Sequence, residues 1–498
     1  MGFFVRRNPP GDELTDAAHL LWATPDIDSR RAARSAAALV AVQRVLRDDP
    51  ALPGATAFLA LYDIVAAADP QHFTRVWRDP AAYHWVRRAV HLLSVWNGEA
   101  LPAWEQTYCD ALGAAGAAQA LPLHLAQFGK FALATALIAG TDLRLPAAYA
   151  TAPPLALSGT ELALVGRGRV VVHGVESGGL DVSHDGTRRR LAPQQTAAGQ
   201  AARLDVCPTV QIGGARVVLN PYVFHLPGLS LFSELSGAGV EFQARYQGAV
   251  ADALAALQRF QPATFAQFAD AIRIVALKPA REEDFGTLST SELPGAFVCS
   301  VPADPLALAA DFIHELHHGR LFSIEEDGPF FDASGEDAVE GEHHYSPWRD
   351  APRPLHGLLH ALYVYLPVFR FWSAAWRACE LDGMRRDFAR DQLARIPFQL
   401  RIAVQQLRRH AHFTPFGSSL FEQMACEADA IKAEAATLGA TLATGAVACR
   451  ASGAFRPIER SGRQLTVAEN LLDHLRRCDR GNECAEERDL LAQSAGAS

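Results

Sequence analysis

Apolar and polar positions follow three successive patterns along the chain. From about residue 12 to 150, Ala-, Leu- and Arg-rich stretches are interrupted by Pro-Gly, Asp-Pro and Gly-rich turns, which is typical of consecutive helices. From 155 to 226, short β-branched runs alternate with the turn signals Ser177-Gly178-Gly179, Asp185-Gly186 and Gly213-Gly214, which predicts strands joined by hairpins. Helical periodicity then returns and continues to about residue 478.

These patterns predict a mainly α protein with a β-rich insert, of the α+β class. We place a helical N-terminal region at 1–150, a β-rich subdomain at 151–227, a helical metal-binding catalytic domain at 228–480 and a flexible tail at 481–498. The elements expected in the catalytic domain are helices at 248–261, 264–277, 354–379 and 420–438, a helix running through 407, and a strand at 296–301.

The segment His314–His318, with the sequence H-E-L-H-H, carries the most specific chemical signal. On a helix, residues four apart lie one above the other on the same face, so His314 and His318 can offer imidazole nitrogens to one metal ion. A helix is expected because Asp304-Pro305 supplies a cap and a favoured first residue, and Gly319 offers an end. The segment therefore predicts half of a metal site on a metal-binding helix.

The usual interpretation of an H-E-x-x-H helix is a zinc peptidase, in which the glutamate acts as general base. Glu315 follows His314 directly and so points about 100° away from it around the helix. That position suits a general base or a hydrogen-bond acceptor better than a metal ligand. His317 lies near the face of His314, where it can support a ligand histidine.

A third ligand has to come from elsewhere, and three sources are open. They are Glu336 and Glu340 in the acidic loop at 324–344, the adjacent pair His343-His344, and the following helix with His356 and His360 four residues apart. Because an inward histidine opposite a metal helix needs a partner, the last source is the strongest. We therefore expect the metal-binding helix to pack against this second, histidine-bearing helix.

Two arginines lie between the predicted metal helix and the second histidine helix. Arg349 and Arg353 belong to the segment Tyr345–Pro354, which three prolines stiffen. A guanidinium held rigidly near a metal ion is suited to binding a carboxylate through two parallel hydrogen bonds. Arginines are also common on the surface of a protein of this composition. Chemistry alone therefore favours neither a carboxylate-binding role nor an ordinary surface position for Arg349 and Arg353.

The composition of the chain indicates which partners to expect and in which cellular compartment the protein works. The formal net charge of −9 argues against nucleic acid as the main partner. The eight cysteines include no C-x-x-C pair, which favours a reducing compartment. The chain shows no secretory signal, and its apolar run at 358–369 is too short to span a bilayer. We expect a cytoplasmic protein without a membrane partner.

The segment from Leu288 to Trp376 resembles the 2-oxoglutarate-dependent H-E-x-x-H peptide β-hydroxylases of ribosomal peptide natural-product pathways. The resemblance rests on L-S-T-S-E-L-P-G-A at 288–296, Asp304-Pro305, the histidine motif, P-W-R-D at 347–350 with R-P-L at 353–355, and G-L-L-H-A-L-Y at 357–363. It covers roughly a fifth of the chain. The ordered combination is far more specific than the first motif alone.

This resemblance implies an Fe(II) dioxygenase that uses 2-oxoglutarate and O2 to hydroxylate the β-carbon of a side chain in a precursor peptide. It implies His314, His318 and His360 as metal ligands, with Glu340 as the alternative carboxylate, and moves Glu315 to a supporting role. The residues expected near the 2-oxoglutarate carboxylate are Arg353, Arg349, Tyr345 and Trp348, while His317 and His356 would lie beside the ligands. Expected partners are a ribosomal precursor peptide and a radical-SAM or other modifying enzyme of the same pathway. Zinc remains the alternative metal.

Overall fold

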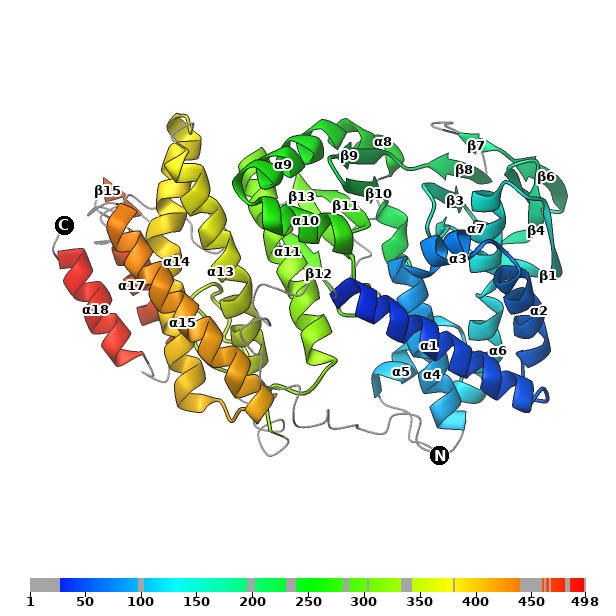
Figure 1. Ribbon diagram of the computed structural model, residues 1–498, viewed down its shortest axis with the longest axis horizontal. Coiled ribbons are helices and arrows are strands. Elements are labelled where there is room, and N and C mark those ends of the chain that lie inside the picture. The colour runs from blue at the N-terminus through cyan, green and yellow to red at the C-terminus, as the bar shows by residue number, and fades with distance from the viewer. Residues whose placement is uncertain are drawn as a thin grey trace. The chain divides into compact units, whose positions relative to one another are not determined.

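The computed structural model of the chain describes residues 27–96, 103–194, 202–229, 239–280, 286–301, 304–332, 343–378, 381–438, 459–460, 463–464, 467–479 and 484–496 (Figure 1). It is a mixed α/β structure with 60% helical residues and several sheets. The chain forms two compact units. The first consists of Asp28–Ala255 and Ala266–Pro305, and the second contains Ala256–Phe265 and Leu306–Ser498.

Helices open the first unit. They are α1 (Ile27–Asp48), α2 (Ala55–Ala66), α3 (Pro70–Trp77), α4 (Pro80–Trp96), α5 (Ala103–Ala111), α6 (Ala117–Ala126) and α7 (Gly129–Ala139). Large aromatic side chains fill the space between them: the ring of Trp85 packs 5.8 Å from Phe58 and 5.0 Å from Phe128. The helical region predicted to reach residue 150 ends earlier, because the extended chain of β1 begins at Leu143.

One stretch in these helices, Ala117–Ala139, is long and apolar enough to cross a membrane. It comprises α6 and α7, and 67% of its most apolar window is buried inside the structure. Core helices of this kind pass the same test of length and composition, so the stretch is weak evidence for a membrane span.

The strands that follow form two antiparallel-rich sheets. The first has the order β1-β4-β5-β6 and the second β2-β3-β8-β7. The strands are β1 (Leu143–Thr151), β2 (Leu155–Ala156), β3 (Leu162–Gly166), β4 (Val170–Glu176), β5 (Gly179–His184), β6 (Thr187–Leu191), β7 (Pro193–Gln194) and β8 (Ala202–Val206). The β-rich character predicted for this part of the chain is therefore confirmed.

The three predicted hairpin turns are present. Ser177 and Gly178 join β4 to β5, Asp185 and Gly186 join β5 to β6, and Gly213 lies between β9 (Thr209–Ile212) and β10 (Ala215–Leu219). Each turn has at least one residue with positive φ. Because this conformation matches the right-handed twist of paired strands, two-residue turns of this kind fix the strand register.

A mixed five-stranded sheet, β12-β13-β11-β10-β9, completes the first unit. Its further members are β11 (Ile274–Pro279), β12 (Thr287–Ser289) and β13 (Ala296–Val301), and β11 runs parallel to β10 and β13. The strand predicted at 296–301 is confirmed. The helix predicted at 264–277 is wrong in its second half, since α10 (Pro262–Ala271) ends before β11. The run Ile274–Leu277 is buried on both faces, and such a run carries no period that separates strand from helix.

Glu292, which lies between β12 and β13, joins this sheet to α4. Its carboxylate accepts hydrogen bonds from His84 at 3.1 Å and Arg88 at 3.0 Å. Burial alone would raise the pKa of Glu292, but the His84 hydrogen bond and the Arg88 charge outweigh it and hold the pKa at about 2. Glu292 belongs to the L-S-T-S-E-L-P-G-A segment of the sequence, so that segment has a structural role in the first unit.

Replacing Glu292 with Gln should lower the free energy of unfolding by about 1–2 kcal/mol at pH 7, after allowance for the partial exposure of the pair. The folded pKa lies below the usual value of 4.5, so this stabilisation is present above pH 4.5 and is lost as the pH falls toward 2. Urea unfolding at pH 7, 4.5 and 3 measures it. A variant as stable as the wild type at pH 7 would contradict the prediction.

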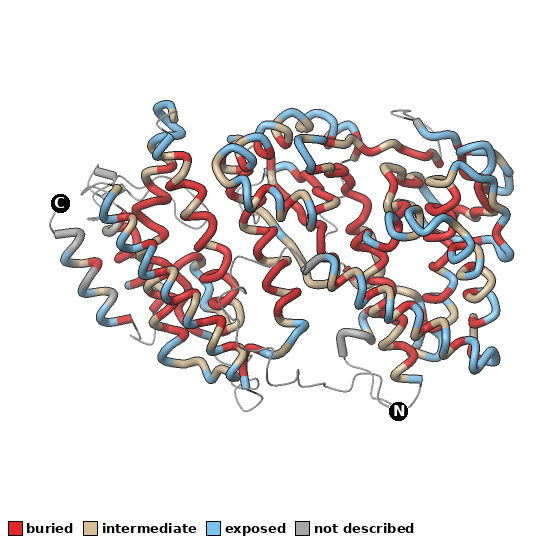
Figure 2. Tube along the Cα trace, viewed as in Figure 1, coloured by how far each residue is buried: buried red, intermediate tan, exposed pale blue. Residues whose placement is uncertain are grey.

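Helices dominate the second unit. They are α11 (Pro305–Glu325), α13 (Leu355–Arg377), α14 (Gly383–His410), α15 (Pro415–Leu438), α17 (Val467–Cys478) and α18 (Ala485–Gly496), with the short pair β14 (Glu459–Arg460) and β15 (Arg463–Gln464). Helices α13, α14 and α15 pack against one another, α17 contacts α14, and α18 contacts α17 (yellow to red in Figure 1). Figure 2 shows buried residues along much of α13 and α14. Helices α8 (Val240–Arg245) and α9 (Gln247–Phe260) precede α10 in the chain.

Two local predictions in this unit are corrected. Gly319 does not end the metal helix, because α11 continues to Glu325 and buries Leu321 and Ile324 in its last turns. The tail predicted to be flexible at 481–498 contains α18, whose Leu491 is buried. In both cases tertiary packing of apolar side chains outweighs the local signal.

Candidate metal centre

Helix α11 begins at Pro305, as the sequence predicts, and carries His314 and His318 on one face. Their Nε2 atoms lie 3.1 Å apart. Two imidazole nitrogens bound to one ion at about 2.0–2.1 Å lie about 2.8–3.4 Å apart, depending on whether the angle between them is octahedral or tetrahedral. The separation therefore fits two ligands of a single metal ion.

His360 reaches the pair from α13. Its Nδ1 lies 3.0 Å from Nδ1 of His318, and the two rings stack with centroids 5.3 Å apart. The contact uses the ring nitrogen of His318 that faces away from His314. An ion bound between His314 and His318 would therefore be out of reach of His360 in this conformation. The side chain of His360 has to rotate before all three histidines can bind the same ion.

Helix α11 also carries an acidic residue that the sequence reasoning missed. Glu325 accepts a hydrogen bond from His356 Nε2 at 2.9 Å, and Glu325, His356 and His360 each offer a ligand atom within 4.8 Å of the others. This set is a second arrangement of donors that could hold a metal ion, and it shares His360 with the first. Glu325 lies seven residues after His318, two helical turns along the same face, and that spacing was the signal available in the sequence.

The histidines are held neutral by their surroundings. Burial lowers the pKa of His314 to about 3, with further contributions from the charges of Arg353 and Arg349, and burial also lowers the pKa of His318 and His360. Neutral imidazole is the form that binds metal ions. The Nε2 atom of His360 is buried and has no hydrogen-bond partner among the described residues, so it is available to a ligand. The donor set fits a divalent metal.

The two arginines lie on a closed loop beside these histidines. His344 and Arg353 exchange backbone hydrogen bonds of 2.8 and 2.9 Å, which joins the two ends of the segment 344–353. Gln399 on α14 donates to the carbonyl of Pro347 at 2.8 Å, and Trp348 stacks on Tyr365 of α13 with centroids 5.0 Å apart. The rigid presentation predicted from the prolines is thus reinforced by two helices.

Arg353 carries a charge that the described part of the chain does not neutralise with a carboxylate. Its recorded hydrogen bond there is a long contact of 3.5 Å to the carbonyl of Gly357. Burial and repulsion by Arg349 lower its pKa to about 10. The indole nitrogen of Trp348 is also buried and lacks a hydrogen-bond partner among the described residues. The loop 344–353 therefore carries a guanidinium and an indole donor, and such donors suit a carboxylate ligand.

Tyr345 is placed differently from the other residues expected to contact a co-substrate. Its hydroxyl lies 2.7 Å from Nδ1 of His474 on α17, and Nε2 of His474 lies 3.2 Å from Asp350. The side chain is therefore engaged in fixing the loop to α17. Tyr345 therefore anchors the segment that carries the arginines, and its contact with a co-substrate stays a prediction.

Two carboxylates lie on α11 next to the histidines. Glu315 is buried, and its charge raises the pKa of Arg349 against the effect of burial. Asp311, which the sequence reasoning did not single out, has its pKa raised to about 7 by burial and by the charge of Glu315. Perturbed carboxyl groups of this kind concentrate at functional sites. The i, i+4 spacing of the two residues was visible in the sequence.

His317 contacts the backbone of its own helix and an aromatic ring of α13. Its Nδ1 lies 2.7 Å from the carbonyl oxygen of Ile313, and its ring packs against Tyr363. His343 is exposed, and His344 packs against His410 with ring centroids 4.4 Å apart. The alternative ligands Glu336 and Glu340 lie outside the described residues.

Comparison with known proteins adds no family assignment. No model of a known protein family matches the chain, and no curated protein matches it. The interpretation of the site therefore depends on its own geometry and on the resemblance of its motifs.

Proposed function

We propose that the protein is an Fe(II)- and 2-oxoglutarate-dependent dioxygenase that hydroxylates a side-chain β-carbon of a ribosomally made precursor peptide. The observation that carries this proposal is the position of Arg349 and Arg353 beside the histidines. Their charges are among the causes that lower the pKa of His314. Two guanidinium groups next to a metal cation repel it unless an anion lies between them.

A dicarboxylate co-substrate resolves that repulsion. His314, His318 and His360 would hold the metal, which leaves positions for 2-oxoglutarate and O2. Arg353 would pair with the distal carboxylate, with Arg349 and the indole N–H of Trp348 beside it. When bound, Fe(II) supplies the O2 chemistry through which 2-oxoglutarate, O2 and a peptide C–H bond yield succinate, CO2 and a peptide hydroxyl group.

The chain's own residues orient and shield the reactants. The loop 344–353 positions the guanidinium groups, and the aromatic rings of Trp348, Tyr365 and Phe322 line the neighbourhood of the histidines. Burial that excludes water strengthens the electrostatic interactions at such a site. The peptide class of substrate follows from the resemblance carried by residues 288–376, and Glu315 acts as a supporting carboxylate.

Succinate formation tests this function without knowledge of the precursor peptide. Purified protein loaded anaerobically with Fe(II) and then exposed to O2 and 2-oxoglutarate should produce succinate and CO2 above the rate of free Fe(II). Zinc loading should give none. Absence of any protein-dependent succinate, with and without candidate precursor peptides, would overturn the proposal.

The Glu315→Gln variant separates this function from that of a zinc peptidase with Glu315 as general base. In the dioxygenase, we expect the variant to bind Fe(II) and to retain succinate formation within about tenfold of the wild type, as for a residue that supports ligands. In a zinc peptidase, the same change would abolish peptide cleavage while zinc stays bound. Peptide cleavage by the zinc-loaded wild type that is lost in this variant would refute the dioxygenase.

A further inference from the structure

A cavity of about 490 Å³ in the first unit is lined by four arginines. They come from segments far apart in the chain: Arg75 from α3, Arg78 just after α3, Arg216 from β10 and Arg273 just before β11. Arginine is common on the surface of this protein, but these four residues line one open cavity. Cations gathered in a cavity create a strong positive potential there.

Acidic groups compensate this charge only in part. Glu161 pairs with Arg216 and lies 3.6 Å from Arg75. Asp79 is the acidic residue among those lining the cavity. It is buried, and it accepts backbone hydrogen bonds from Ala81 and Gly159. Burial raises its pKa, against the effect of those hydrogen bonds. The lining therefore holds more positive than negative charge, and Arg78 is exposed and forms no ion pair within the described residues.

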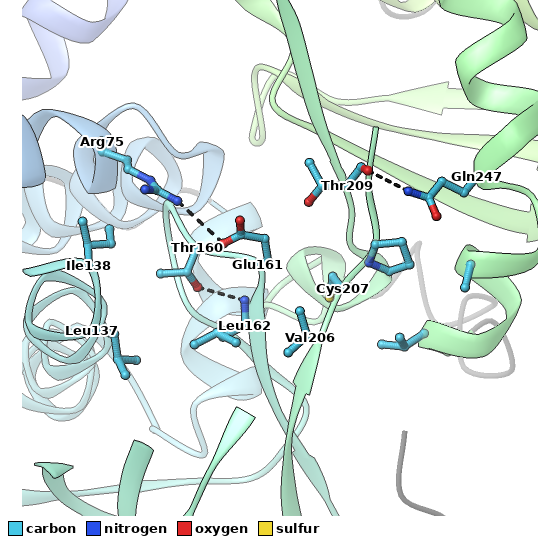
Figure 3. A pocket seen from close by; sticks show the side chains of 13 residues that line it. Arg75, Leu137, Ile138, Thr160, Glu161, Leu162, Val206, Cys207, Thr209 and Gln247 are labelled. Atoms are coloured by element: carbon cyan, nitrogen blue, oxygen red, sulfur yellow. Dashed lines mark hydrogen bonds and ion pairs between the residues drawn. The ribbon is translucent and has the colours of Figure 1, made fainter. Parts of the chain in front are cut away.

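A second cavity, of about 800 Å³, is drawn in Figure 3. It shares the lining residues Arg75 and Thr160 with the first cavity. Its lining mixes apolar residues with polar ones, Glu161 among them. Gln247 donates a hydrogen bond to the carbonyl of Thr209. The apolar lining residues are Leu137, Ile138, Leu162, Val206, Pro208, Val240 and Ala244. Together the two cavities place four arginines beside a group of apolar side chains.

We propose that these adjoining cavities bind a segment of an acidic peptide, with carboxylates among the four arginines and apolar side chains in the larger cavity. Guanidinium groups bind carboxylates through paired, directional hydrogen bonds, while apolar walls select neighbouring residues of the peptide. The choice of a peptide rests on the proposed function. The site lies in the first unit, whereas the candidate metal centre belongs to the second.

Fluorescence anisotropy tests this site directly. The probe is a fluorescein-labelled octapeptide of six glutamates and two leucines, and its control has six glutamines in place of the glutamates. We expect saturable binding of the acidic peptide that weakens with added salt, at least tenfold tighter than binding of the control. The protein is used as the full chain in EDTA, without 2-oxoglutarate. Failure of the dioxygenase assay therefore leaves this result unaffected.

A matched pair of double variants locates the binding. Arg78→Gln with Arg216→Gln removes two charges from the arginine-lined cavity and should weaken binding about tenfold or more. Arg169→Gln with Arg190→Gln removes two charges from exposed positions that line neither cavity, and should change binding less than twofold. Thermal unfolding of both variants checks that they fold.

Three outcomes would overturn the proposal. They are no saturable binding by the wild type, equal losses in the two double variants, and displacement of the probe by inorganic phosphate at the concentration of the peptide. The last outcome would identify a site for small anions.

Discussion

Replacement of His318 with Ala should abolish stoichiometric Fe(II) binding and lower succinate formation from 2-oxoglutarate by more than about 100-fold. Replacing a residue that only hydrogen-bonds to a metal ligand already lowers metal affinity or activity by about 10–100-fold. The physical reason is the position of His318 between the other two histidines: its Nε2 lies 3.1 Å from His314 and its Nδ1 lies 3.0 Å from His360. No other described side chain makes both contacts. Anaerobic metal analysis of the folded variant measures binding independently of activity.

His317 provides the matched control for this experiment. It lies on the same helix, one residue away, but its Nδ1 contacts the carbonyl of Ile313 and its ring packs on Tyr363. His317→Ala should therefore lower stability while the purified, folded protein still binds one equivalent of Fe(II). Equal loss of metal in both variants, or full metal content in His318→Ala, would contradict the assignment.

The same measurement separates the two donor sets that share His360. His360→Ala should weaken metal binding in either arrangement. Glu325→Gln and His356→Ala should leave it within about tenfold if those residues only support the ligands, and abolish it if Glu325, His356 and His360 hold the ion.

Replacement of Arg353 with Gln should raise the KM for 2-oxoglutarate by about 30-fold or more, which corresponds to about 2 kcal/mol for loss of a buried charge partner. Arg353 lies on the closed loop 344–353 and is repelled by Arg349, so a bound dicarboxylate gains two guanidinium contacts. The metal content should be unchanged, because the arginine is not a ligand. Initial rates of succinate formation at varied 2-oxoglutarate measure the effect.

Two further variants control the Arg353 experiment. Arg353→Lys keeps the charge but loses the paired hydrogen bonds, so its KM should lie between those of the wild type and Arg353→Gln. Arg408→Gln removes an exposed arginine on α14 and should leave the KM unchanged. If the Arg353→Gln variant has the KM of the wild type for 2-oxoglutarate, Arg353 does not bind this co-substrate.

Local patterns were enough to predict several features of this protein. The strand at 296–301, the hairpin turns at Ser177, Asp185 and Gly213, and a helix starting at Pro305 are all present. Each depends on residues close together in the chain: positive φ at a turn, proline at a first helical position, or a run of buried β-branched and apolar residues. The four-residue spacing of His314 and His318 belongs to the same class, because the helical period alone brings them together.

Tertiary packing decided the features that local patterns misplaced. The apolar run at 274–277 is a strand because it lies between β10 and β13, and α11 passes Gly319 because Leu321 and Ile324 are buried. Neither result can be predicted from neighbouring residues alone. Burial on both faces removes the periodicity that would distinguish the strand at 274–277 from a helix. In α11, long-range contacts outweigh the effect of a single glycine.

The sequence by itself determined the helical spacing of the histidines, the turns of the β-rich part and the placement of two arginines near a histidine helix. Only the tertiary structure decided that His474 anchors Tyr345 from 129 residues away, that Glu325 joins His356 and His360, and that four distant arginines line one cavity. The physical reason is the range of the interactions. Backbone geometry fixes neighbours within a helix or a turn, whereas contacts between side chains on separate elements depend on how the whole chain packs.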